Sequence, residues 1–145
     1  MNLQIAVQIG TLVSVILGVY GLYKGIQNYK RQANAQIFLA YTERYEKIME
    51  TFPSEALFAR LSLDGKPPEP NEKLTIAVLR YLNLCSEEFY LCNRKYLDKE
   101  VWQIWEEELK RTLRSPLFLR EWKKLKKEFQ TYPQFRDFVE RVQGG

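Results

Sequence analysis

The sequence predicts an all-α protein in which an N-terminal transmembrane helix continues into a small multi-helix bundle. Three observations indicate this class. The first 23 residues carry no charged side chain, apolar residues recur at helical spacing over most of the remainder, and no useful length of sequence alternates between apolar and polar residues as a strand would. We divide the chain into a transmembrane helix over 1–23, a basic juxtamembrane stem over 24–31 and a cytoplasmic helical bundle domain over 32–143.

The uncharged stretch is long enough to cross a bilayer. It runs for 22 residues from Asn2 to Tyr23, and a helix of that length reaches roughly 30 Å, the thickness of the hydrocarbon core. Tyr20 and Tyr23 lie at its end, where aromatic rings favour the headgroup level. Two other interpretations stay open. A signal peptide has its positive charge before the apolar run, whereas here it follows, and a buried soluble helix seldom lacks charge over this length.

The bases nearest the span predict its orientation. Lys24, Lys30 and Arg31 follow the apolar run and no base precedes it, which favours an outside N-terminus and a cytoplasmic C-terminal domain at the cell (inner) membrane. Residues 32–145 hold 19 bases and 18 acids, so most of the net charge of +4 comes from the stem. A general nucleic-acid-binding surface is therefore not indicated.

Small and polar residues share one face of the predicted span. They recur at steps of three and four, and Gly10, Ser14 and Gly18 also form a small-xxx-small register. Small residues let helices approach closely, and glutamine amides can hydrogen-bond across a helix pair. We expect self-association or a membrane partner here, although glycine is also simply common in such helices. The predicted helix-packing face comprises Gln4, Gln8, Thr11, Ser14, Gly18, Gly21 and Gly25.

The helical pattern continues beyond the stem. An apolar seam at heptad-like spacing is typical of one face of a globular core, and less so of a short coiled coil. We expect a helix from the span to about Thr51, with Gly25 as the point for any kink, because Pro53 then interrupts it. The seam comprises Phe38, Tyr41, Tyr45, Ile48 and Phe52.

Start signals place the remaining helices. Ser54 is the expected cap of a short helix over 54–63, and the sequence DGKPPEPN over 64–71 predicts a loop. Asn71 is the expected cap of a helix over 72–97. Further starts are expected at Asp98, at Ser115 with Pro116, and at the TYP sequence ending in Pro133. Inward positions are predicted at Leu74, Val78, Tyr81, Leu82, Cys85, Phe89, Cys92, Val101, Trp102, Trp105, Leu109, Leu113, Leu119, Trp122, Leu125, Phe129, Phe135, Phe138, Val139 and Val142.

No constellation indicates an enzyme. Histidine is absent, which removes the commonest general base and zinc ligand, and no glycine-rich phosphate loop is present. Cys85 and Cys92 lie about 10 Å apart along one helix, too far to bridge, and are expected in the core. We predict no catalytic residue, cofactor or metal. The acidic groups are expected on solvated helix faces: Glu43, Glu46 and Glu50; Glu87 and Glu88; and Glu106, Glu107 and Glu108.

Charge is distributed unevenly within the domain. Residues 110–127 carry a net charge of +7, whereas residues 41–109 carry −5. Near a cytoplasmic leaflet, such a basic surface could bind anionic lipid or an acidic protein, although an ordinary solvated surface fits equally well, and RNA binding is not favoured. The block comprises Lys110, Arg111, Arg114, Arg120, Lys123, Lys124, Lys126 and Lys127.

The third and fourth predicted helices carry a resemblance. The sequence LRYLNLCSEEFYLCNRKYLDKEVWQIW over 79–105, followed by Trp122 and Phe135, resembles an uncharacterised bacterial family of small proteins with an N-terminal transmembrane helix and a helical domain of unknown function. The shared positions are Tyr81, Leu82, Asn83, Glu87, Leu97, Asp98 and Trp105, within a match over about 37–140. The resemblance implies a single-pass membrane protein and supplies no catalytic residue.

Two functions follow from these observations. The leading hypothesis is a single-pass, membrane-anchored helical interaction or adaptor protein. The alternative is an oligomerising membrane effector or channel subunit, whose cytoplasmic helical domain would regulate it. In that case Gln4, Gln8, Thr11 and Ser14 would line a contact or a pore.

Overall fold

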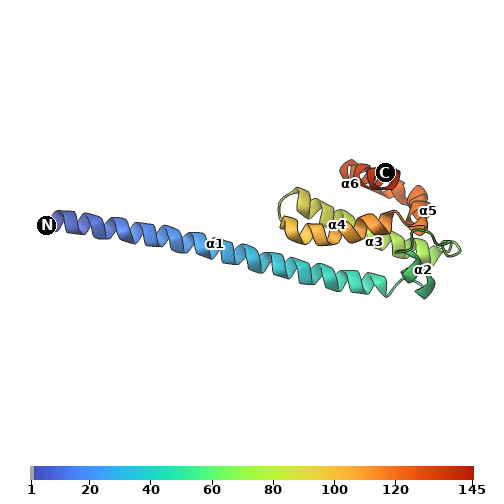
Figure 1. The fold of residues 1–145 in the computed structure, drawn as a ribbon, viewed down its shortest axis with the longest axis horizontal. Helices are drawn as coiled ribbons and strands as arrows, with labels where there is room; N and C mark the ends of the chain where they lie inside the picture. The colour runs from blue at the N-terminus through green and yellow to red at the C-terminus, as the bar shows by residue number, and fades with distance from the viewer. Residues whose placement is uncertain (1) are drawn as a thin grey trace. The chain divides into compact units, whose positions relative to one another are not determined.

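A computed structural model describes residues 2–145, and all regular secondary structure in that range is helical (Figure 1). The predicted all-α class is therefore confirmed. The chain forms two compact units, residues 1–37 and residues 38–145, which are described separately below.

The first unit is formed by the long helix α1 (Leu3–Met49), which continues into the second unit. The helix has no break at Gly25, and it ends two residues before the expected Thr51. The Thr51 amide donates to the Ile48 carbonyl at 2.9 Å, which closes the last turn ahead of Pro53. No described side chain of α1 is buried.

The second unit contains the end of α1 and the helices that follow. These are α2 (Ser54–Ala59), α3 (Glu72–Asn93), α4 (Lys99–Leu113), α5 (Pro116–Leu125), the 3-10 turn η1 (Lys126–Phe129) and α6 (Pro133–Gly144). Helix α3 packs against α4 and α5, and α6 packs against α4 and η1 (Figure 1). The result is the small bundle that the sequence predicts.

An aromatic cluster fills the bundle between α3, α4 and α6. The Phe89 ring lies with its centroid 5.0 Å from that of Phe138, 5.7 Å from Phe135, and 6.0 Å from both Trp102 and Tyr132. Most of these rings meet at steep or tilted angles, an arrangement worth about 0.5–1.5 kcal/mol per pair beyond the burial of their area. The Phe89 side chain therefore joins α3 to both α4 and α6.

Helix starts agree with the sequence at most positions. The Asn71 side chain accepts the Leu74 amide at 2.8 Å, and the Ser115 hydroxyl accepts the Phe118 amide at 3.4 Å, with Pro116 as the first helical residue. The expected cap at Ser54 is wrong. Pro53 takes the extended cap position, so Ser54 is the first residue of α2.

Two helices are shorter than expected. Helix α2 ends at Ala59 rather than at residue 63, because the following amides close tighter turns, such as Ser62 to the Ala59 carbonyl. Helix α3 ends at Asn93 rather than at residue 97. There Lys95 adopts a left-handed conformation with φ of 59°, and the Tyr96 amide donates to the Leu91 carbonyl at 2.9 Å. This is the Schellman ending, with lysine where glycine is usual.

The predicted core is mostly confirmed. All four inward positions of α6 are buried, and so are most of those of α3, α4 and α5. Five predicted positions are only half-buried, namely Phe89, Cys92, Val101, Trp105 and Leu119. Both cysteines are free, with Cys85 buried, which agrees with the expectation that they do not bridge.

Candidate functional site

The apolar part of α1 exposes its side chains on every side. Leu3, Leu12, Leu17 and Leu22 are each more than 60% exposed, and none of the most apolar window of α1 is buried. By length and composition, α1 is the one helix among the described residues that could cross a membrane. An apolar surface of this extent is unusual on a soluble monomer.

The predicted small-residue face lies along this helix, fully exposed. A shallow groove runs past Gly18, Gly21 and Gly25, walled by Leu22, Ile26 and Tyr29. A methyl group placed on any of these three glycines would meet no other atom within 4 Å. The groove at these glycines is therefore not used for packing within the described chain.

The polar residues of the same face satisfy themselves within the helix. The Thr11 hydroxyl donates to the Val7 carbonyl and the Ser14 hydroxyl to the Gly10 carbonyl, each at 2.9 Å. Such bonding to the preceding turn lets hydroxyls enter an apolar environment without an unmet donor. Gln8 and Gln4, which lie about one and two turns before Thr11, are exposed.

The juxtamembrane bases are exposed next to aromatic rings. The Lys24 ammonium lies 5.7 Å from the centroid of the Tyr20 ring, one turn back on α1. Lys30 and Arg31 are exposed as well. This combination of aromatic ring and base is typical of a helix end at the headgroup level.

In the second unit, polar contacts hold the end of α1 against α3. The Arg44 guanidinium donates to both carboxylate oxygens of Glu87, at 2.6 and 3.0 Å, and the Tyr41 hydroxyl donates to the same carboxylate at 3.3 Å. The hydrogen bonds from Arg44 lower the pKa of Glu87, while burial raises the pKa of Tyr41. The seam residues of α1 are half-buried, and this face of the helix lies against the bundle, which agrees with the interpretation favoured from the sequence.

A second polar cluster joins α1, α2 and α4. Glu108 accepts the Tyr45 hydroxyl at 2.6 Å and the Arg60 guanidinium at 2.9 Å. The guanidinium also lies 5.8 Å from the centroid of the Tyr45 ring. Burial, together with the bond to Glu108, raises the pKa of Tyr45 well above its ordinary value.

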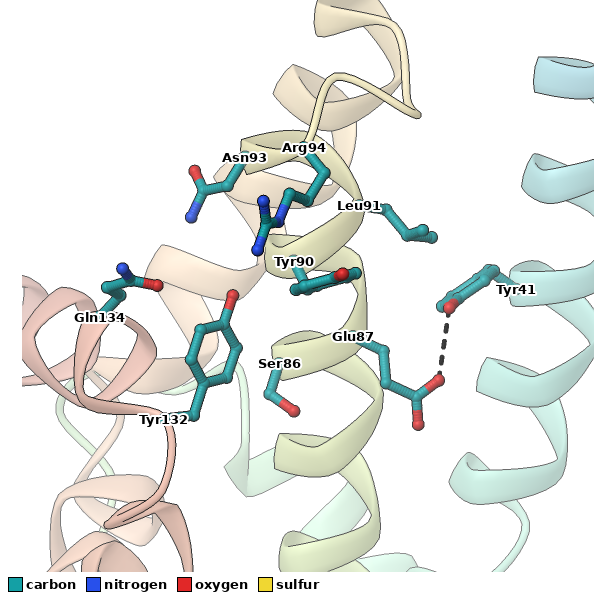
Figure 2. Close-up of a pocket in the computed structure, with 9 residues that line it drawn as sticks. All are labelled: Tyr41, Ser86, Glu87, Tyr90, Leu91, Asn93, Arg94, Tyr132 and Gln134. Atoms are coloured by element: carbon teal, nitrogen blue, oxygen red, sulfur yellow. Dashed lines mark hydrogen bonds between the residues drawn. The ribbon is translucent and has the colours of Figure 1, made fainter.

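An open pocket of about 960 Å³ lies beside the C-terminal half of α3 (Figure 2). Figure 2 shows Tyr90 on α3 and Arg94 directly after the helix, with Tyr132 and Gln134 across from them. The Arg94 guanidinium lies 5.5 Å from the centroid of the Tyr90 ring. Tyrosine and arginine are enriched at the energetic centres of protein interfaces. The lining comprises Tyr41, Ser86, Glu87, Tyr90, Leu91, Asn93, Arg94, Tyr132 and Gln134.

Half of the basic block has partners inside the domain. Lys110 pairs with Glu106 at 3.0 Å, and both Arg120 and Lys124 pair with Glu121, at 2.9 and 3.4 Å. Further bonds join Arg120 to the Pro68 carbonyl at 2.5 Å and Arg114 to the Val142 carbonyl at 3.3 Å. These four bases brace the fold. The other four are exposed, namely Arg111, Lys123, Lys126 and Lys127.

The chain matches no protein-family model, no curated protein and no solved structure. The family resemblance drawn from residues 79–105 therefore stays a prediction, and function has to be argued from this chain's own geometry.

The expectation that every acidic group lies on a solvated face is wrong for Glu88. Its side chain is 7% exposed, and burial raises its pKa from 4.5 to about 8. Helical spacing already carried the signal, because Glu88 lies three residues after the inward position Cys85. Glu121 lies within the basic block, and no role was predicted for it from the sequence. The structure buries it fully. Among the described residues, no group of three or more Cys, Asp or Glu could hold a metal ion.

Proposed function

We propose that this chain is a single-pass membrane-anchored interaction protein, with its helical bundle in the cytoplasm. The observation that carries the proposal is the exposed apolar helix from Leu3 to Tyr23, attached to a helical domain with its own packed core. The bundle buries its own core, so it does not need the apolar helix for folding. Burying the helix in lipid would remove the large apolar surface from water.

The anchor is tested by placing charges in the middle of the span. Lysine at both Leu12 and Ile16 should release the chain from membranes that resist carbonate extraction, since each lysine at a helix centre costs about 2.5–3.5 kcal/mol of insertion. The matched control is phenylalanine at both positions. Retention of the lysine variant would contradict the anchor. A mature protein shortened by the length of the span would instead indicate a cleaved signal.

Orientation follows from the bases after the span. Cysteines introduced at Asn2 and at Gly145 should differ in labelling by a membrane-impermeant maleimide applied to intact cells. Only the Asn2 position should react, because positive charge is retained on the cytoplasmic side. Labelling of the Gly145 position alone would reverse the proposed topology.

The interaction surface is proposed at the open pocket of Figure 2 and at the exposed bases of the basic block, residues 110–127. Its tyrosine, arginine and amide groups are of the kind that binds a protein partner. Crosslinking in native membranes followed by mass spectrometry tests this. A different protein linked to the bundle, including through lysines of 110–127, supports an adaptor. Self-adducts through the span alone would favour the effector.

The effector alternative draws on the exposed polar and small face of the span, which could associate with copies of itself. Overexpression separates the two functions. Ion leakage and growth arrest that disappear on deletion of residues 1–23 would indicate an effector or channel subunit, whereas harmless expression supports the interaction protein.

A further inference from the structure

A slot of about 220 Å³ opens between the end of α1 and helices α3 and α4, entirely within the second unit. It is smaller than the ~300–1,000 Å³ typical of sites for drug-sized ligands, so any ligand is small. Five of its lining residues are aromatic and come from three helices, namely Phe38, Tyr41, Tyr45, Tyr81 and Trp105.

The rings around the slot are ordered against one another. Phe38 lies nearly parallel to Trp105, at 5° with centroids 5.9 Å apart, and Tyr41 lies 5.6 Å from the same indole. Tyr45 meets Tyr81 edge-on at 6.3 Å. The faces of aromatic rings carry partial negative charge and attract cations. Two of these rings already have a cation nearby, since the Arg44 guanidinium lies 5.0 Å from the Tyr41 centroid and that of Arg60 lies 5.8 Å from the Tyr45 centroid.

One carboxyl group in this slot has no partner. Glu88 lines the cavity and is 7% exposed, and no hydrogen bond or ion pair joins it to the described residues. The other carboxyl group, that of Glu108, already binds Tyr45 and Arg60. The carboxyl oxygens of Glu88 are not completely enclosed, so this group is open to the slot, where a ligand could meet it.

We propose that the slot binds a small organic cation of the alkylammonium class. The positive nitrogen would lie against the Glu88 carboxylate, and its methyl or methylene groups would lie against the rings of Tyr41, Tyr45 and Trp105. A metal ion fits less well, because calcium needs six to eight oxygen ligands and magnesium needs about six. The slot offers rings and two carboxyl groups, one of which is already engaged.

Binding should release a proton. Burial raises the pKa of Glu88 to about 8; the charges of Glu108 on α4 and Glu87 on α3 raise it further, and that of Arg44 on α1 lowers it. At neutral pH the empty slot therefore holds mostly the protonated carboxyl group. A cation in the slot favours the carboxylate, so the O–H bond breaks and the proton passes to the buffer as the ammonium group takes its place.

The test is calorimetric titration of the full chain in detergent micelles at pH 7 with tetramethylammonium chloride, against sodium chloride at equal ionic strength. Two buffers of different ionisation enthalpy measure the proton released. We expect saturable binding of tetramethylammonium alone, with close to one proton released per ion. Choline should bind at least about tenfold more tightly than 3,3-dimethylbutanol, its neutral isostere.

Two variants and a control assign the effect. Glu88→Gln resembles the protonated carboxyl and should fold normally, yet lose both cation binding and proton release. Trp105→Leu should weaken binding and keep the proton release. Glu100→Gln removes a charge at an exposed position on α4 and should change neither. Unchanged binding in Glu88→Gln, equal binding of the neutral isostere, or no saturable binding of tetramethylammonium at tens of millimolar would each overturn the proposal.

Discussion

Arg44 and Glu87 form a two-pronged ion pair between α1 and α3, with Nη1–Oε2 at 2.6 Å and Nη2–Oε1 at 3.0 Å. The two residues are 43 positions apart, and each side chain is about half exposed, 45% for Arg44 and 46% for Glu87. The pair lies beside the slot, because the Tyr41 hydroxyl, which belongs to a residue lining the slot, donates to the same Glu87 carboxylate at 3.3 Å.

Because the pair is half exposed, its expected worth is small. A double-mutant cycle of Arg44→Gln and Glu87→Gln should give a coupling of about 0.2–1 kcal/mol, falling as salt is added. Arg44 lowers the pKa of Glu87, so this stability is present above the ordinary range of a glutamate and is lost as the pH falls through the lowered value. Denaturation in micelles followed by tryptophan fluorescence measures it, since all three tryptophans lie in the bundle. A coupling of zero would mean that the seam alone holds α1.

The end of α3 contains a removable strain. Lys95 holds a φ of 59°, and a side chain in this left-handed region costs about 1–2 kcal/mol that glycine avoids. Lys95→Gly should therefore stabilise the bundle by about 1 kcal/mol, while Lys95→Ala should leave its stability nearly unchanged. Thermal unfolding of the two variants decides the matter. Equal melting temperatures would show that the lysine side chain makes a contribution that offsets the strain.

Glu121 is a completely buried acid whose carboxylate depends on partners from two parts of the bundle. Its side chain is fully buried, accepts the Thr75 hydroxyl at 2.8 Å and pairs with Arg120 at 2.9 Å. Removing the acid takes this acceptor from the Thr75 hydroxyl and from Arg120, which keeps its bond to the Pro68 carbonyl, so Glu121→Ala should lose about 3 kcal/mol. The control is Lys124→Ala, which removes a 48% exposed partner of the same carboxylate and should cost at most about 1 kcal/mol. Similar losses in both variants would contradict a central role for the buried pair.

These positions show what could be predicted from the sequence. Helix starts were accessible, because Asn71 and Ser115 cap an amide three residues away and the chemistry is local. The end of α3 at Lys95 could not be predicted, because lysine rarely adopts the left-handed conformation that it has here. The aromatic core followed from helical spacing.

The contacts of two acids depend on distant residues instead. Glu121 meets Thr75 across 46 positions and Glu108 meets Arg60 across 48, so no local pattern identifies these contacts. The slot and the open pocket are formed by side chains from separate helices, so neither could be predicted from the spacing of residues along the sequence. The predicted small-residue face of the span has a groove in the structure, and no described residue packs into it beside Gly18, Gly21 or Gly25.

Glu88 should make the bundle less stable as the pH rises. Its pKa is raised from 4.5 to about 8, so between these values the folded chain holds a proton that the unfolded chain has lost. The free energy of unfolding should fall by up to about 1.4 kcal/mol per pH unit across this window and level off outside it. Burial is the main cause of the raised pKa, Glu108 on α4 and neighbouring Glu87 raise it further, and Arg44 on α1 lowers it. Glu88→Gln should flatten the profile between pH 5 and pH 8, and an unchanged slope would assign it to another group.

The groove on the span gives the most direct test of association. Gly18 and Gly21 are exposed, and a methyl group at either would touch nothing in the chain. Isoleucine there fills the groove without disturbing the isolated helix, so any effect reports a contact with a second helix. Gly18→Ile and Gly21→Ile should each weaken association in a membrane two-hybrid assay severalfold, whereas Val19→Ile, one residue off this face, should not. If both glycine variants associate like the parent, the groove is not an interface and the glycines reflect only the ordinary composition of a membrane helix.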